Sequence, residues 1–282
     1  MNALLEVLGV AANARVLQVG SADGRFAREL LSPAAEVTVP GLAADGSGAA
    51  TGGDVVADWL ARRRPQDATF DLVLQMASLA DAGGVGDAVI EAAPDLLDDD
   101  GVLLLVVTDP SGLSSLVRST QDDEDHGHVA PDLTGRLVDA GLRSVRRLIP
   151  YPSLQDAAVV VDARTWETPA GRDVATAEVR RPLAGDAHGL IHDPIGAFQR
   201  ASREGRAAGI ADTTIYLARL TPMDADSDRA RVWLLPETHR EGDWRRTLEI
   251  AYDGRHWTRY PLGPEHALED GPLRLDPTPR PV

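Results

Sequence analysis

A glycine-containing turn near the start of the chain is the segment whose residues could bind a ligand. Residues 16–31 (VLQVGSADGRFARELL) read as a strand, a turn with Gly20 and Gly24, and then a helix. Glycine lets the backbone approach a ligand closely, and the turn directs the N-terminus of the helix at it. The pattern indicates a small-molecule site, and many open α/β folds share it.

The elements around this turn predict an α/β fold. Over the first 160 residues, short β-type runs alternate with helical patterns, which is typical of a parallel sheet covered by helices. The expected strands span residues 15–20, 36–39, 70–75, 101–108, 145–149 and 157–161. The expected helices lie near residues 26–31, 55–60, 89–97 and 132–141, the last ended by Gly141.

The C-terminal part has a different pattern. Residues 195–208 favour a helix, and residues 214–220 favour a strand. An acidic linker follows, and then two β-rich stretches at 230–235 and 247–260, the second with a hairpin turn at Tyr252-Asp253-Gly254-Arg255. We therefore expect two units, residues 1–221 and a small β-hairpin-rich appendage at 222–282.

Composition excludes several kinds of chemistry. The 282 residues carry a net charge of −16, which disfavours nucleic acid as a partner. There is no Lys, which excludes Schiff-base chemistry and Walker-type phosphate loops, and no Cys, which excludes disulfides and thiolate-bound zinc. No apolar run reaches the roughly 18 residues that span a bilayer, and the start lacks a signal-peptide pattern, so we expect a cytoplasmic protein.

Taken together, these segments resemble the class I S-adenosylmethionine-dependent methyltransferase family. The family's acidic-x-Gly-x-Gly-x-Gly pattern is matched by Gln18-Val-Gly20-Ser-Ala22-Asp-Gly24, and its Gly-Asp element by Gly53-Asp54. Residues 70–82, 96–107 and 128–148 resemble its later strand and helix motifs. The resemblance implies a Rossmann-like, doubly wound, mostly parallel seven-stranded sheet with an antiparallel last strand at residues 213–220.

The resemblance also implies a set of site residues. Those expected to bind S-adenosylmethionine are Gln18, Gly20, Ala22, Gly24, Asp54, Met76 and Ala77. Three of the family's usual residues are replaced: Gln18 stands for an acid, Ala22 for a glycine, and Pro40 occupies the place of the acid that holds the ribose. Loss of such a charge-assisted hydrogen bond, worth about 1.5–3 kcal/mol, weakens the predicted cofactor site.

The expected reaction is methyl transfer to a small-molecule or glycan acceptor. Such a transfer mainly requires alignment of the two reactants, and an oxygen nucleophile also benefits from a general base. The candidate catalytic residues are His126 and His128, in a loop that borders the acceptor pocket in this family, and Tyr151 in a Pro-Tyr-Pro segment. That segment resembles one in methyltransferase-like modules of bacterial glycan assembly, which places the protein in biosynthesis.

Other interpretations of the sequence stay open. The replaced cofactor residues also fit a catalytically silent, methyltransferase-like scaffold or binding module. A protein partner could bind the C-terminal appendage, whose Trp-rich hairpin otherwise forms a small core. The acidic run around His126 could hold a divalent cation, but we expect a solvated loop and no metal site. A short-chain dehydrogenase is excluded because the chain has no lysine.

Overall fold

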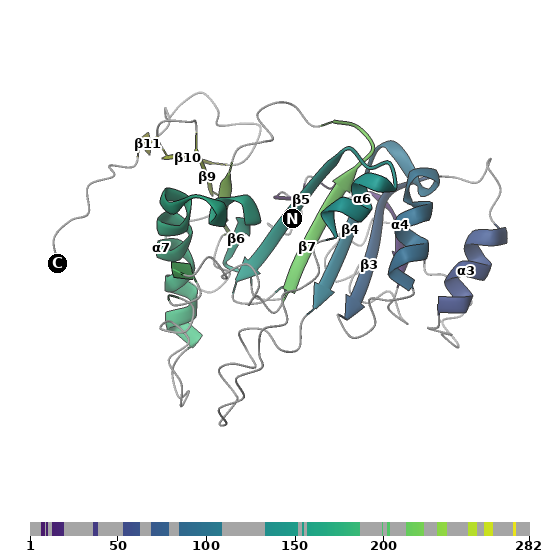
Figure 1. The fold of residues 1–282 in the computed structure, drawn as a ribbon, viewed down its shortest axis with the longest axis horizontal. Helices are drawn as coiled ribbons and strands as arrows, with labels where there is room; N and C mark the ends of the chain where they lie inside the picture. The colour runs from purple at the N-terminus through teal and green to yellow at the C-terminus, as the bar shows by residue number, and fades with distance from the viewer. Residues whose placement is uncertain are drawn as a thin grey trace.

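A single mixed β-sheet connects the described parts of the chain (Figure 1). The structure is a computed structural model, and it describes residues 7–8, 10, 13–19, 36–38, 53–62, 69–78, 85–108, 133–151, 154, 157–186, 199, 202–203, 213–222, 230–235, 248–252, 257–261 and 273–274. The strands are β1 (Arg15–Val19), β2 (Glu36–Thr38), β3 (Phe70–Ser78), β4 (Leu97–Thr108), β5 (Ser144–Tyr151), β6 (Val159–Asp162), β7 (Thr213–Arg219), β8 (Arg231–Leu234), β9 (Leu248–Tyr252), β10 (Trp257–Pro261) and β11 (Leu273–Arg274).

The order of the strands is β11-β10-β9-β8-β6-β5-β7-β4-β3-β1-β2. Strands β2, β1, β3 and β4 are parallel neighbours. Strand β7 lies between β4 and β5 and is antiparallel to both, as expected for the reversed strand at residues 213–220. From β5 outward to β11, every neighbouring pair of described strands is antiparallel.

The sheet therefore differs from the predicted one in its size and strand directions. Among the described residues it has eleven strands, where seven were predicted, and the parallel pairs of these strands are β2–β1, β1–β3 and β3–β4. The β-rich stretches expected in a separate appendage continue the same sheet, because β8 pairs with β6 and β9 pairs with β8. The predicted hairpin is present, since β9 and β10 pair antiparallel on either side of residues 253–256.

The central strands are buried on both faces of the sheet. In β4, Leu104 and Val106 pack in one core cluster, whereas Leu103 and Leu105 pack in the other. Such two-sided burial explains why residues 101–108 form a continuous apolar run. We call the face with Leu103 and Leu105 the helix face, because residues of α4 (Val85–Leu96) and α6 (Thr134–Asp139) pack on it.

The helices follow local sequence signals. Helix α3 (Gly53–Arg62) packs Trp59 and Leu60 against the helix-face core, as the predicted apolar stripe requires. Helix α6 ends at Gly141, which has a φ of +98°. The N–H groups of Gly141 and Leu142 donate to the carbonyls of Val138 and Leu137, the pattern of a Schellman cap. Within the described helices, none is long and apolar enough to cross a bilayer.

Helix α7 (Pro169–Asp186) is an element that the sequence patterns did not predict. It follows the short 3₁₀ helix η2 (Ala163–Glu167), and Figure 1 shows it at the end of the molecule beside β6. Thr168 caps it, since its Oγ1 accepts a hydrogen bond of 3.1 Å from the N–H of Gly171, and Pro169 takes the first helical position. Over residues 169–179, where burial is described, its buried residues are Gly171, Ala175 and Val179, which form only a narrow apolar stripe.

An ion-pair network joins the amino ends of three central strands. The Arg15 guanidinium on β1 lies 3.1 Å from Asp71 of β3 and 2.9 Å from Asp98 of β4. The backbone N–H of Arg15 also donates to Asp71, at 2.7 Å. The hydrogen bonds from Arg15 hold the pKa of the Asp71 carboxyl below its ordinary value of 3.8.

A pair of glycines tests how closely α7 packs on the residues before it. A Cβ at Gly171 would overlap the carbonyl oxygen of Thr165 and lie 2.8 Å from Thr168 Oγ1, whereas a Cβ at Gly135 in α6 would meet nothing within 4 Å. Gly171→Ala should therefore lower the free energy of unfolding by about 1–3 kcal/mol. Gly135→Ala, the control, should leave it unchanged or raise it by up to about 1 kcal/mol. Urea unfolding measures both, and equal effects would contradict the packing described here.

The second prediction concerns the acid stability of the Arg15–Asp71 pair. Because the folded pKa of Asp71 lies below its unfolded value, the pair stabilises the fold above about pH 3.8 and loses this effect as the pH falls through the folded pKa. Asp71→Asn should therefore flatten the fall of stability below about pH 4. Urea midpoints measured from pH 7 to pH 2 check this, with Asp139→Asn on the exposed side of α6 as the control. Identical pH profiles for wild type and Asp71→Asn would contradict it.

Candidate functional site

The strand order reverses at β1, and this reversal locates the candidate site. Strand β2 lies on one side of β1, while β3, the next strand along the chain, lies on its other side. The chain therefore continues from β1 to a neighbour on one side and from β3 to β4 on the other, which makes the β1–β3 boundary a topological switch point. In open α/β sheets, ligands bind at such a topological switch point. The candidate site is thus the edge of the sheet beyond Val19 and Ser78.

Two buried glutamines lie just before this edge. Gln18 of β1 is fully buried, and Gln75 of β3 is 1% exposed. In the sheet register, Gln18 is opposite Leu74 and Val19 is opposite Gln75. Side chains alternate between the two faces of a sheet, so the amides sit at adjacent positions but on opposite faces. Gln75 shares the helix face with Val19, and Gln18 shares the other face with Val16.

The side-chain oxygen of Gln75 has no hydrogen-bond donor among the described residues. This Oε1 atom is buried and accepts no hydrogen bond from the part of the chain that the structure describes. A buried polar atom in this state costs about 1–3 kcal/mol, and a glutamine offers two N–H donors in addition to its oxygen. The amide therefore suits a ligand that brings donors and acceptors to the carboxyl end of β3. This property fits a nucleoside cofactor.

The described polar side chains of the strands near this edge are uncharged. Besides the two amides, the edge carries the hydroxyls of Thr108, at the end of β4, and of Thr213, its partner at the start of β7. By contrast, Arg146 lies in the distal half of the sheet, where burial and the charge of Arg231 lower its pKa to about 10. The described groups at the switch point are thus suited to binding and orienting a ligand, and proton transfer needs groups from elsewhere.

Several of the predicted site residues lie outside the described residues. These are Gly20, Ala22, Gly24, His126, His128 and Pro40. Asp54 lies in the first turn of α3 and Ala77 near the end of β3, and the structure describes the backbone of both. Met76 is partly buried and packs against the same core cluster as Leu74, next to the predicted crevice.

Tyr151 has the surroundings of a core side chain. It is at the carboxyl end of β5, 1% exposed, and belongs to a cluster with Ile149 and Val161. Its ring meets that of Trp166 edge-on, with 6.5 Å between the ring centroids and an angle of 75° between their planes. This packing favours a structural role for Tyr151 over the catalytic role predicted from the sequence.

Gln75 is the residue that the sequence resemblance missed. The resemblance assigned Met76 and Ala77, the two residues that follow Gln75 in β3, but not Gln75 itself. The signal was nevertheless present, because a glutamine interrupts the apolar run of FDLVLQMAS, at a position now seen to be buried. A polar side chain in a strand that is buried on both faces requires a hydrogen-bond partner, and the structure is needed to show that the side chain is buried.

Comparisons with known proteins give similar folds at low identity. No protein-family model matches the chain, and no curated protein matches it. The chain is similar to solved structures of S-adenosylmethionine-dependent methyltransferases. One from Archaeoglobus fulgidus is 12% identical, with a TM-score of 0.40 over 77% of this chain and 94% of that one. A glycopeptide N-methyltransferase complexed with sinefungin is 13% identical, with a TM-score of 0.37 over 77% and 91%.

Another similar structure has a different activity in its name. A cyclase is 16% identical to this chain, with a TM-score of 0.32 over 78% of this chain and 81% of that one. Similarity at this level does not identify a ligand or a reaction. The strand order and the residues at the switch point indicate instead what the chain could bind.

The unsatisfied acceptor of Gln75 gives a test of its role that needs no ligand. If the amide is kept for binding, its removal should not harm the fold. Gln75→Met, which nearly conserves side-chain volume, should leave the free energy of unfolding unchanged or raise it. The control is Leu105→Met at the neighbouring position on β4, which should cost less than about 1.5 kcal/mol. A loss of more than about 2 kcal/mol for Gln75→Met would instead indicate a structural role for the amide.

Proposed function

We propose that the chain binds S-adenosylmethionine at the switch point between β1 and β3 and transfers its methyl group to a small-molecule or glycan acceptor. The observation that carries this proposal is the strand order, which reverses at β1, the strand that leads into the glycine-containing segment. The buried amides of Gln18 and Gln75 support it, because they supply polar groups at the ends of these two strands.

Different residues of the chain would contact different parts of the cofactor. Gln18 and Gln75 would hydrogen-bond the polar groups of the nucleoside or of the amino-acid portion, while Met76 would supply apolar surface next to them. Gly20 and Gly24 would let the backbone approach the cofactor closely. Asp54 and Ala77 complete the set proposed from the sequence. When bound, the cofactor supplies an electrophilic methyl group on a positively charged sulfur.

The described side chains that we assign to the site, those of Gln18, Gln75 and Met76, carry no charge, so the proposed catalysis depends on alignment. Holding two reactants in line can supply about 7–11 kcal/mol of the barrier reduction. If the acceptor attacks through oxygen, His126 and His128 are the proposed bases that take up its proton. Tyr151 contributes to the core that supports β5.

A catalytically silent binding module is the second candidate. It is favoured by one observation, which is that β1 ends with an amide at Gln18 where the family has a carboxylate. Such a module would keep the fold and the crevice without methyl transfer. The two candidates give different results in the same pair of assays, one for binding and one for product.

Calorimetric titration with S-adenosylmethionine and S-adenosylhomocysteine tests the proposed site. Both should bind the wild-type protein, and Gly20→Val should abolish binding because a branched side chain fills the close approach. Gln75→Met should weaken binding roughly tenfold, the value of about one hydrogen bond of 1.4 kcal/mol. Gly135→Ala, on an open face of α6, is the control and should bind as the wild type does.

The outcomes separate the two candidates. Binding together with formation of S-adenosylhomocysteine in the presence of an acceptor mixture supports the methyltransferase. Binding of a glycan or protein but of neither nucleoside, even at millimolar concentration, supports the silent module and overturns the cofactor proposal. Unchanged affinity in both Gly20→Val and Gln75→Met would also overturn the proposed site.

A further inference from the structure

A second candidate site lies on α7, far along the sheet from the switch point. One face of α7 and the helical residues near position 202 line a pocket of about 530 Å³ that is open to solvent. Arg172, Asp173 and Thr176 line one wall, at the spacing of a single helix face, and Gln199, Ser202 and Arg203 line the other. The volume is within the range of roughly 300–1,000 Å³ that small-molecule sites have.

The two walls are joined at the base of the pocket. Thr176 Oγ1 and Ser202 Oγ share a hydrogen bond of 2.7 Å, and Ser202 is 4% exposed. Ala175, which directly precedes Thr176, and Val179 are buried against the core that includes residues of β5 and β6. The floor of the pocket is therefore anchored to the sheet, and each hydroxyl keeps capacity for a further hydrogen bond.

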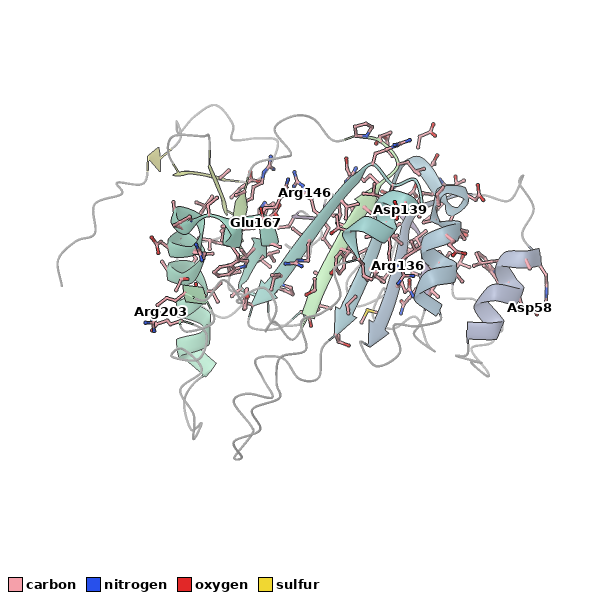
Figure 2. The ribbon with its side chains drawn as sticks, in the orientation of Figure 1. Asp58, Arg136, Asp139, Arg146, Glu167 and Arg203 are labelled. Carbon is pink, nitrogen blue, oxygen red and sulfur yellow. The ribbon has the colours of Figure 1, made fainter. Side chains whose placement is uncertain are left out.

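Two arginines, one from each wall, line this pocket, and neither has an acidic partner among the described residues. Arg172 is half-buried in the first turn of α7, and Arg203 is exposed on the other wall, where Figure 2 shows it at the outer side of the helix. Arg203 Nε donates to the carbonyl of Gln199 at 3.3 Å, which orients the guanidinium. Neither arginine forms an ion pair within the part of the chain that the structure describes, although the whole protein carries a charge of −16.

These observations define the chemistry of a ligand. Guanidinium groups match the planar geometry of carboxylates and the oxygens of phosphates. The positive end of the 18-residue helix α7 lies next to Arg172 and favours the same charge. Asp173 is the one acidic group among the lining residues, and it is exposed at the rim. The hydroxyls and Gln199 suit a polar body attached to the anionic group.

We propose that this α7 pocket binds a small polar molecule bearing a phosphate or carboxylate group, held between Arg172 and Arg203. The site is separate from the proposed cofactor crevice, because β6, next to α7, is four strands away from β3 in the sheet. The proposal therefore does not depend on methyl transfer, and its failure would leave the cofactor proposal untouched.

Calorimetric titration of the full chain with three related probes tests this proposal. Glucose 6-phosphate, glucuronate and glucose share a sugar body and differ in carrying a phosphate, a carboxylate or no charge. At least one anionic probe should bind at least tenfold more tightly than glucose, and the preferred one identifies the anion. Arg172→Gln and Arg203→Gln, on opposite walls, should each weaken that binding roughly tenfold, as expected for a charge-assisted hydrogen bond.

Two further variants make the test specific to the pocket. Asp173→Asn removes the carboxylate at the rim and should tighten binding of the anionic probe, because it removes a like charge. Arg62→Gln, at the exposed end of α3, removes an arginine elsewhere and should change nothing. The proposal is overturned if neither anionic probe binds better than glucose. It is also overturned if Arg172→Gln and Arg203→Gln bind as well as the Arg62→Gln control.

Discussion

Burial of the central strands on both faces is the constraint on which the rest of the structure depends. Strands β1, β3 and β4 are covered by one apolar cluster on each side, so their sequences are almost continuously apolar. A strand in this position has little room for polar side chains. The amides of Gln18 and Gln75 are the buried polar side chains toward the carboxyl edge, and a ligand there could satisfy the acceptor of Gln75.

The two ends of the parallel strands differ in how their polar groups are satisfied. At the amino edge, Arg15 ties β1 to β3 and β4 through charged hydrogen bonds within the protein. At the carboxyl edge, the acceptor of Gln75 has no such partner among the described residues. Natural proteins keep an unsatisfied buried group mainly where function requires it. The fold thus places ion pairs at the amino end of the parallel strands and an unsatisfied amide acceptor toward their carboxyl end.

Sequence patterns predicted the four parallel strands of the sheet well because their signals are local. The apolar run of β4, the stripe of α3 and the cap at Gly141 each depend on a few neighbouring residues. The continuation of the sheet through β8 to β11 was missed, since pairing of β8 with β6 is a long-range contact that no local pattern encodes. Helix α7 was missed because the residues that it buries are as small as Gly171 and Ala175.

The candidate site was predicted only in part, for the same reason. The resemblance identified Gln18 from a motif, whereas Gln75 became visible through its burial and its register opposite Val19. Tyr151 shows the reverse case. Its neighbouring prolines attracted attention in the sequence, but its contact with Trp166 arises from packing between β5 and η2.

A crystal structure of the protein with S-adenosylhomocysteine tests the central claim most directly. The account predicts that the nucleoside lies beyond the carboxyl ends of β1 and β3, with a polar atom within hydrogen-bonding distance of Gln75 Oε1. Density for the nucleoside elsewhere on the protein would contradict it. A crevice filled by the protein's own side chains, with no density at the switch point, would contradict it equally.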